Sequence, residues 1–291
     1  MFPRLCPAAV RARGWAVTVL RRGLAGTGQQ EHVPLTQCVQ QAGIRKITMN
    51  NPQKRNALSL AMLQALQKDI LHEIDDKDLR VIVIAANGPV FSSGHNLKEF
   101  TAAHGKAHHI DVFDACVKLM TTIQTVPVPV IAQVNGLATA AGCQLVASCD
   151  IAVVSEKSKF ATPGVNVGLF CSTPAVALGR AVPRKVALEM LFTGEPISAH
   201  DALLHGLVSK VVPEENLEEE TIKLARKICQ TSRAVVALGK ATFYKQISQS
   251  LEEAYRFTSE VMVQNLMLKD GQEGIEAFTQ KRKPLWTNSQ E

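Results

Sequence analysis

The stretch RVIVIAANGPVFSSGHNLK, residues 80–98, carries the local pattern from which the fold of this chain can be predicted. Its first part, Arg80 to Ala86, is a continuous apolar run, which is typical of a strand buried on both faces of a sheet. Its second part, Val90 to Lys98, is expected to close that strand with a turn and to open a helix. Backbone N–H groups in such a turn point outward without partners, so they can bind a developing negative charge.

A second segment, VNGLATAAGCQL at residues 134–145, repeats the order of strand, small-residue turn and helix start. Glycine and alanine gather in this turn because a bulky side chain would keep a ligand away from the backbone. For either turn taken alone, close packing without a ligand remains the favoured interpretation.

Strands and helices alternate through the first half of the chain. Residues 36–49 read as two short strands that turn at residues 41–43. Ser59 is a plausible N-cap for a helix whose apolar residues recur at helical spacing, namely Leu63, Leu66, Ile70 and Ile74. Buried strands are expected at 129–134 and 150–154, with helices around 110–124 and 142–149. This alternation predicts an α/β fold with a mainly parallel sheet.

The second half of the chain is mostly helical in pattern. From about residue 185 the strand signal nearly vanishes, apart from residues 207–212. Helical periodicity covers residues 215–229, 232–246, 250–269 and 271–281. We therefore expect an α/β core followed by a C-terminal helical region.

The basic charge of the chain is concentrated at its N-terminus. The formal net charge is +6, and residues 1–30 contain five arginines without Lys, Asp or Glu. Without those arginines, 27 basic residues stand against 26 acidic ones. An Arg-rich, acid-free leader is typical of a mitochondrial transit peptide, and a disordered basic tail is the alternative. The nearly neutral body and its 5% aromatic content argue against a nucleic-acid-binding face.

Composition sets aside several other classes of protein. No run reaches the roughly 18 consecutive apolar residues that a membrane-spanning helix needs. The seven cysteines form no C-x-x-C pair, which favours reduced thiols and gives no support for a metal site.

Several further motifs occur in one order along the chain. Asn50-Asn51-Pro52 precedes Asn56-Ala57-Leu58 before the first turn, and the segments at 149–152, 159–163, 191–194, 197–199, 206–208 and 273–278 follow the second. With the two turns, they make residues 36–286 resemble the enoyl-CoA hydratase (crotonase) superfamily. The resemblance implies a crotonase-like spiral of ββα units with a C-terminal helical region. It divides the chain into a transit peptide (1–30), a ββα core (31–210) and a helical oligomerisation region (211–291).

The resemblance also implies a ligand and an assembly. The expected partner is an acyl-CoA thioester, as substrate or ligand, with no other cofactor and no metal. The expected assembly is a homotrimer or homohexamer, in fatty-acid metabolism of the mitochondrial matrix.

The resemblance assigns the backbone N–H groups of His95 and Ala141 to an oxyanion hole for the thioester oxygen. Each donor in such a site is worth roughly 2.7 to 4 kcal/mol to a reaction. It further implies that CoA is bound by Lys54, Arg55, Asn96, Leu97, Lys98, Lys281 and Lys283. For the charged side chains in this set, the alternative is a solvated surface position without a ligand.

The chain departs from the family pattern where catalysis is concerned. Family hydratases place glutamates at the positions that here hold Gln144 and Gly164. A glutamine cannot exchange a proton near neutral pH, and a glycine has no side chain. A positioned general acid or base contributes about 10²- to 10⁴-fold to a rate, so ordinary hydratase activity is not expected. The family's glycine-rich stretch is also altered here, at residues 168–174, which implies a reshaped acyl pocket.

Other side chains could substitute for the missing glutamates. The imidazole of His95 is a candidate general base. Asp111 and Asp114 are expected in the first turn of a helix that borders the pocket, where acidic residues usually serve the macrodipole. Cys143 lies at a helix N-terminus, which can depress a thiol pKa, although a small buried cysteine is commoner. Two more positions could orient a polar acyl group: Asn166 and Ser172.

Two functions remain open beside the disfavoured nucleic-acid binder. The first is an acyl-CoA-binding protein without hydratase chemistry, a possible pseudoenzyme. The second is an enzyme that needs only oxyanion stabilisation, such as a decarboxylase of 2-carboxyacyl-CoA or a thioesterase using His95.

Overall fold

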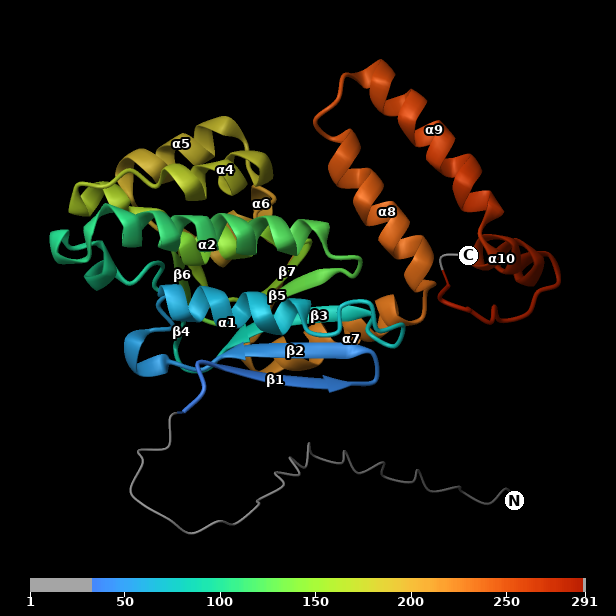
Figure 1. Cartoon of the computed structure of the whole chain (residues 1–291), viewed down its shortest axis with the longest axis horizontal. Helices are drawn as coiled ribbons and strands as arrows, with labels where there is room; N and C mark the ends of the chain where they lie inside the picture. Colours follow the sequence, from blue (N-terminus) through green and yellow to red (C-terminus); the bar gives the residue numbers. More distant parts are fainter. Residues whose placement is uncertain (1–32, 290–291) are drawn as a thin grey trace, which may run out of the picture. The chain divides into compact units, whose positions relative to one another are not determined.

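The computed structural model describes residues 33–289, and its centre is a six-stranded sheet (Figure 1). The strand order is β1-β2-β3-β5-β7-β10; β1 is antiparallel to β2, and every other neighbouring pair is parallel. The predicted α/β class with a mainly parallel sheet is therefore confirmed. The strands span Thr36–Gln41 (β1), Ile44–Met49 (β2), Val81–Ala86 (β3), Val130–Val134 (β5), Ile151–Ser155 (β7) and Lys210–Val212 (β10).

A second, four-stranded sheet has the order β4-β6-β8-β9. After each of β3, β5 and β7, the chain crosses into this sheet for one short strand and then forms a helix. The result is three successive ββα units, as the resemblance implies. The added elements are β4 (Val90–Ser92), β6 (Leu137–Thr139), β8 (Lys159–Ala161), β9 (Ile197–Ser198), α2 (Gly105–Thr125), α3 (Ala141–Ser148) and α4 (Ser172–Ala181).

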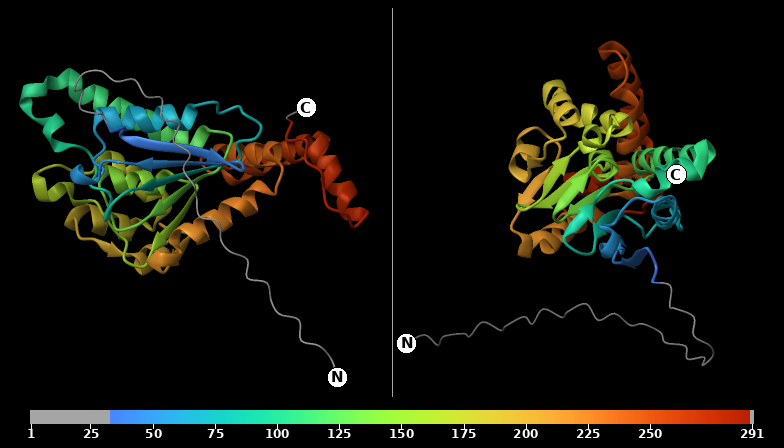
Figure 2. Two further views of the ribbon diagram at one scale, coloured as in Figure 1. Left: turned by 90° about the horizontal axis from the view of Figure 1, so that it is seen from below. Right: turned by 90° about the vertical axis from the view of Figure 1, so that its left-hand side faces the viewer.

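Alternate residues of the central strands enter two different cores. Ile82 and Ile84 of β3 join the larger core, which α1 (Leu60–Leu71) and α2 cover. Val81 and Val83 face the other way, against α7 (Leu217–Cys229). Figure 2 shows these helices on the two faces of the sheet. The two covered faces explain why the strands read as continuous apolar runs.

Four helices complete the C-terminal region. After α7 come α8 (Arg233–Gln246), α9 (Leu251–Met267) and α10 (Lys269–Thr279), close to the predicted ranges. Helices α8 and α9 pack side by side, and α8 also contacts α2 (Figure 1). The connecting elements of the fold are α5 (Arg184–Thr193) and α6 (Ala199–Leu204), together with short 3-10 turns.

Several local expectations were wrong. Residues 90–92 do not close the preceding strand but form β4 of the second sheet. Ile74 lies beyond the end of α1, although it packs against the core from the turn that follows. Helix α2 begins at Gly105 rather than near residue 110, and only residues 210–212 of the predicted strand 207–212 form β10.

The predicted transit peptide, residues 1–30, lies outside the described residues. Within residues 33–289, no helix combines the length and the apolar character needed to cross a bilayer.

Candidate functional site

The loop before α1 holds the first turn in place through a buried asparagine. The side chain of Asn56 donates to the carbonyls of Asn87 and Val90, both at 2.9 Å, and accepts from the Asn51 amide at 2.9 Å. The Ser92 hydroxyl donates to the Asn56 carbonyl at 2.9 Å. These bonds join three separate segments, so the backbone of the turn is fixed before any ligand arrives.

The second turn meets the first directly. A Cβ atom added to Gly94 would lie 2.9 Å from the Ala140 Cβ, and one added to Gly142 would lie 2.7 Å from Ser92. Because these distances are shorter than van der Waals contact, only glycine lets the two turns come together here. Ala140 itself has φ 49° and ψ −118°, a conformation that alanine rarely adopts. This residue places Ala141 at the first position of α3.

Two backbone amides in these turns have no acceptor. Neither the N–H of His95 nor that of Ala141 donates a hydrogen bond to another residue between 33 and 289. The amides that directly precede them are paired: Gly94 donates to the Ser92 hydroxyl at 3.2 Å, and Ala140 donates to the Ala161 carbonyl at 2.9 Å. Unpaired amides at the start of a helix and in a tight turn attract an anionic or strongly polarised oxygen.

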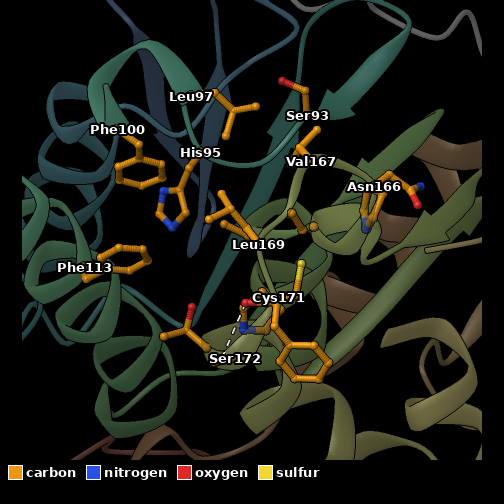
Figure 3. A pocket seen from close by; sticks show the side chains of 17 residues that line it. Ser93, His95, Leu97, Phe100, Phe113, Asn166, Val167, Leu169, Cys171 and Ser172 are labelled. Atoms are coloured by element: carbon orange, nitrogen blue, oxygen red, sulfur yellow. Dashed lines mark hydrogen bonds between the residues drawn. The ribbon is translucent and has the colours of Figure 1, made fainter. Parts of the chain in front are cut away.

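Both residues line a cavity of about 540 Å³ (Figure 3). This volume is in the range that holds a small-molecule ligand. The wall is mainly apolar and comes from the two turns, from α2 and from the loop that leads into α4. It comprises Ser93, His95, Leu97, Phe100, Phe113, Ala140, Ala141, Pro163, Gly164, Asn166, Val167, Leu169, Phe170, Cys171, Ser172, Thr173 and Pro174.

The two positions at which the resemblance implies family glutamates, Gln144 and Gly164, offer no acid or base to this cavity. Gln144 is buried and does not line it; its side-chain oxygen accepts a weak bond from the Cys116 thiol at 3.9 Å. Gly164 does line the cavity, but a Cβ there would lie 2.5 Å from the Leu169 carbonyl oxygen and 2.8 Å from Cys171 Sγ. The loop of residues 169–171 therefore occupies the space that a side chain at position 164 would need.

The imidazole of His95 is fixed within the cavity wall. Its Nδ1 lies 3.1 Å from the Leu58 carbonyl oxygen, and its ring packs edge-on against Phe100 and Phe113, at centroid distances of 5.4 and 5.5 Å. Burial lowers the pKa of this histidine below its usual value. Its Nε2 is buried and has no hydrogen-bond partner among residues 33–289.

The residues expected to bind CoA fall into two groups. Lys54 and Arg55 are exposed and precede α1. The Arg55 carbonyl accepts a hydrogen bond at 3.0 Å from the amide of Ser93, which lines the cavity. Leu97 lines the cavity and is 53% exposed; the Asn96 side chain caps the short turn that also carries exposed Lys98. The second group, Lys281 and Lys283, follows α10 and does not line the cavity.

Of the other candidates, Asn166 and Ser172 line the cavity. Asp111 and Asp114 do not line the cavity. The expectation that they lie in the first turn of their helix was wrong, because α2 begins at Gly105 and has no acidic residue in its first turn. Cys143 is buried, and burial raises the pKa of its thiol to about 12, which opposes a reactive role.

Sequence reasoning missed most of the apolar wall. Phe100, Phe113 and Phe170 come from three separate segments and share no spacing that predicts a common cavity. The altered stretch at residues 168–174 was the one available signal, since it supplies much of the wall.

Comparisons with known proteins agree with this geometry. The family model described as enoyl-CoA hydratase/isomerase matches residues 39–289. A protein of Xenopus laevis, named enoyl-CoA hydratase domain-containing protein 3, mitochondrial, is 75% identical over 259 residues, covering 89% of this chain and 88% of the relative. The human protein of the same name is 65% identical over 286 residues, covering 97% of this chain and 94% of the relative.

Solved structures show the same fold. The crystal structure of human enoyl Coenzyme A hydratase domain-containing protein 3 has a TM-score of 0.86 and 69% identity, covering 87% of this chain and all of that one. An enoyl-CoA hydratase from Mycobacterium smegmatis has a TM-score of 0.85 and 47% identity, covering 87% of this chain and 99% of that one. The chain therefore belongs to the enoyl-CoA hydratase/isomerase family, within the crotonase superfamily.

Proposed function

We propose that this chain binds acyl-CoA thioesters in mitochondrial fatty-acid metabolism and does not hydrate enoyl-CoA. One observation carries the proposal: the unpaired amides of His95 and Ala141 belong to the wall of one apolar cavity. Such a pair suits a thioester carbonyl oxygen, whose negative charge grows as the carbonyl is polarised. The apolar wall suits the acyl chain that the thioester carries.

The absence of hydration follows from the two substituted positions. Hydration requires one group to activate water and one to protonate the adjacent carbon. Gln144 does not line the cavity, and Gly164 has neither a side chain nor room for one. Each missing acid or base removes about 10²- to 10⁴-fold of rate, so a polarised thioester here has no partner for proton transfer at either position.

The exposed cations beside the cavity support CoA recognition. Lys54, Arg55 and Lys98 lie on loops that adjoin the cavity residues Ser93 and Leu97. CoA carries a diphosphate and a 3′-phosphate, which basic side chains bind through charge-assisted hydrogen bonds. Lys281 and Lys283 would serve the CoA of a neighbouring subunit in the proposed homotrimer or homohexamer, with the matrix as the proposed location.

Exposed apolar side chains of the C-terminal region support that assembly. Phe278, Met267 and Leu251 are 84%, 79% and 77% exposed in the single chain. Apolar surface of this kind marks contacts with other protein surfaces. Light scattering on the purified chain is expected to give a trimer or hexamer mass; a monomer would refute the assembly.

The test of the chemistry uses the full-length chain incubated with crotonyl-CoA and with a 2-carboxyacyl-CoA, followed by mass spectrometry. The proposal predicts that both thioesters remain unchanged. Addition of water at rates normal for the family would refute it. Loss of carbon dioxide would instead support the decarboxylase alternative, and release of free CoA would support the thioesterase alternative.

A control variant is available for binding. Gly94→Ala is expected to weaken acyl-CoA binding, because the added Cβ would push Ala140 and the adjacent free amide away from the first turn. Gly179→Ala is the matched control, since a Cβ at Gly179 meets nothing within 4 Å. Equal affinities of the two variants would argue against the amide pair as the thioester site.

A further inference from the structure

The protonation of the His95 ring can be read from its surroundings. Nδ1 lies 3.1 Å from the carbonyl oxygen of Leu58, and a carbonyl oxygen can only accept a hydrogen bond. The proton of the neutral ring is therefore on Nδ1. The other nitrogen, Nε2, then carries a lone pair and can only accept.

This acceptor has no partner among the described residues. Nε2 is buried, yet neither a side chain nor a backbone group between residues 33 and 289 donates to it. His95 is also a wall residue of the cavity, and its ring packs against Phe100 and Phe113 (Figure 3). Leaving a buried acceptor unpaired is unfavourable. A ligand that brings a donor into the cavity would recover that cost without first stripping water from the imidazole.

The surroundings also keep the ring neutral. Burial of the ring, which packs against Phe100 and Phe113, is the largest cause that lowers its pKa, and the hydrogen bond to Leu58 and the charge of Glu99 oppose it. The Glu99 carboxylate is engaged elsewhere, accepting from the Leu60 amide at 3.0 Å. Near neutral pH the ring therefore presents an acceptor to the cavity and not a cation.

The acceptor belongs to the residue whose amide is proposed to bind the thioester oxygen, and that residue lines the cavity. A thioester held by the His95 amide therefore places the start of its acyl chain in the part of the cavity that His95 lines.

We propose that the imidazole of His95 is a specificity-determining acceptor that recognises a hydroxyl group on the acyl chain next to the thioester. This inference rests on the proposed acyl-CoA binding. The pocket then prefers hydroxyacyl thioesters over unsubstituted ones, which leave Nε2 unpaired. It also disfavours carboxylated thioesters, because a carboxylate has no proton to donate and would place its lone pairs against that of Nε2. The same group thus argues against the decarboxylase alternative.

The exposed parts of the wall allow such a ligand to reach the ring. Phe113 and Leu169 line the same cavity as His95, and their side chains are 39% and 50% exposed. The bond between Nδ1 and the Leu58 carbonyl holds the ring in place.

The test is a calorimetric titration of the full-length chain with butyryl-CoA, 2- and 3-hydroxybutyryl-CoA and malonyl-CoA. One hydrogen bond that replaces an unpaired acceptor predicts about two- to tenfold tighter binding of a hydroxybutyryl thioester than of butyryl-CoA. Malonyl-CoA is expected to bind more weakly than butyryl-CoA. Equal affinities for the hydroxylated and unsubstituted thioesters, or tighter binding of malonyl-CoA, would overturn this inference and leave the proposed function standing.

Two variants separate recognition by the imidazole from a general effect on the pocket. His95→Phe keeps an aromatic ring beside Phe100 and Phe113 but removes the acceptor, so the ratio of hydroxybutyryl to butyryl affinity is expected to fall to about one. Gly179→Ala is expected to keep the wild-type ratio. An unchanged ratio in His95→Phe would contradict the assignment. If the wild-type chain binds no thioester at all, the proposed function fails and this inference falls with it.

Discussion

Ala140 has a backbone conformation that disfavours its own side chain. Its φ of 49° and ψ of −118° belong to a region where glycine is usually required. Such strain costs about 1–3 kcal/mol and persists only where the surrounding structure enforces it. Here the Ala140 amide bonds the Ala161 carbonyl at 2.9 Å, and the next residue begins α3 with its free N–H. The strained conformation of Ala140 thus positions the Ala141 amide, one of the two candidate donors.

Replacing Ala140 with glycine should therefore stabilise the chain. We expect the free energy of unfolding in Ala140→Gly to rise by about 1 kcal/mol, measured by urea titration. Ala147→Gly, in regular helical backbone of the same α3, is the control and should lose about 1 kcal/mol. A loss of stability in Ala140→Gly comparable to that of the control would show that the backbone at this position is not strained.

Position 164 should not accept a glutamate. In Gly164→Glu the Cβ would lie 2.5 Å from the Leu169 carbonyl oxygen and 2.8 Å from Cys171 Sγ. Overpacking of this kind costs about 1–3 kcal/mol. We expect that loss in chemical denaturation, and no hydratase activity even when Gln144→Glu is added.

The control for this substitution lies on the neighbouring helix. At Gly179 in α4 an added Cβ meets nothing within 4 Å, so Gly179→Ala should gain about 0.5–1 kcal/mol through helix propensity. If Gly164→Glu were as stable as the wild type, or if the double variant hydrated crotonyl-CoA, the loop of residues 169–171 would not be the obstacle that the geometry indicates.

At the scale of elements, α8 is fastened to the core by a buried ion pair. Lys240 donates to Asp150 at 2.7 Å and to the carbonyls of Ile123 and Val128 at 2.8 and 2.9 Å. The Tyr244 hydroxyl donates to the same carboxylate at 2.8 Å. One helix thereby holds the end of α2 and the starts of two sheet strands. Burial lowers the pKa of Lys240, and Asp150 opposes that shift.

Removing one partner of this pair should be costly. In Lys240→Met the carboxylate of Asp150 stays buried without its counter-ion, which costs about 3–5 kcal/mol. The exposed pair between Arg256 and Glu252 is the matched control, with side chains 67% and 86% exposed, and Arg256→Met should cost no more than about 1 kcal/mol. Thermal unfolding of both variants measures the difference; similar losses would mean that Lys240 does not anchor α8.

The long elements could be predicted because periodicity is a property of a local segment. The runs at β3, β5 and β7 read as strands covered on both faces, and α7 to α10 read as helices from their apolar spacing. The strands of the second sheet could not be predicted, because two or three residues are too few to show alternation. The start of α2 was missed because Gly105 and the histidines after it carry no capping signal or apolar spacing.

At the scale of the whole molecule, the candidate site comes from residues that the fold brings together. The two turns could be predicted as donors, since small residues after a strand expose backbone amides. The state of the His95 ring could not, because it depends on the Leu58 carbonyl and on Phe113, both of which are distant in sequence. The filled space at Gly164 likewise depends on how the loop of residues 169–171 closes. Contacts of this kind are set by the assembled fold and not by spacing.

The most direct test of the central claim compares two ligands that differ by one carbonyl group. Butyryl-CoA and its thioether analogue, S-butyl-CoA, are titrated by calorimetry into the full-length chain. If the amides of His95 and Ala141 bind the thioester oxygen, the thioester should bind at least about fivefold tighter, because two hydrogen bonds contribute about 0.5–1.5 kcal/mol each. Equal affinities, or no binding of butyryl-CoA, would contradict the claim that these amides form a thioester site.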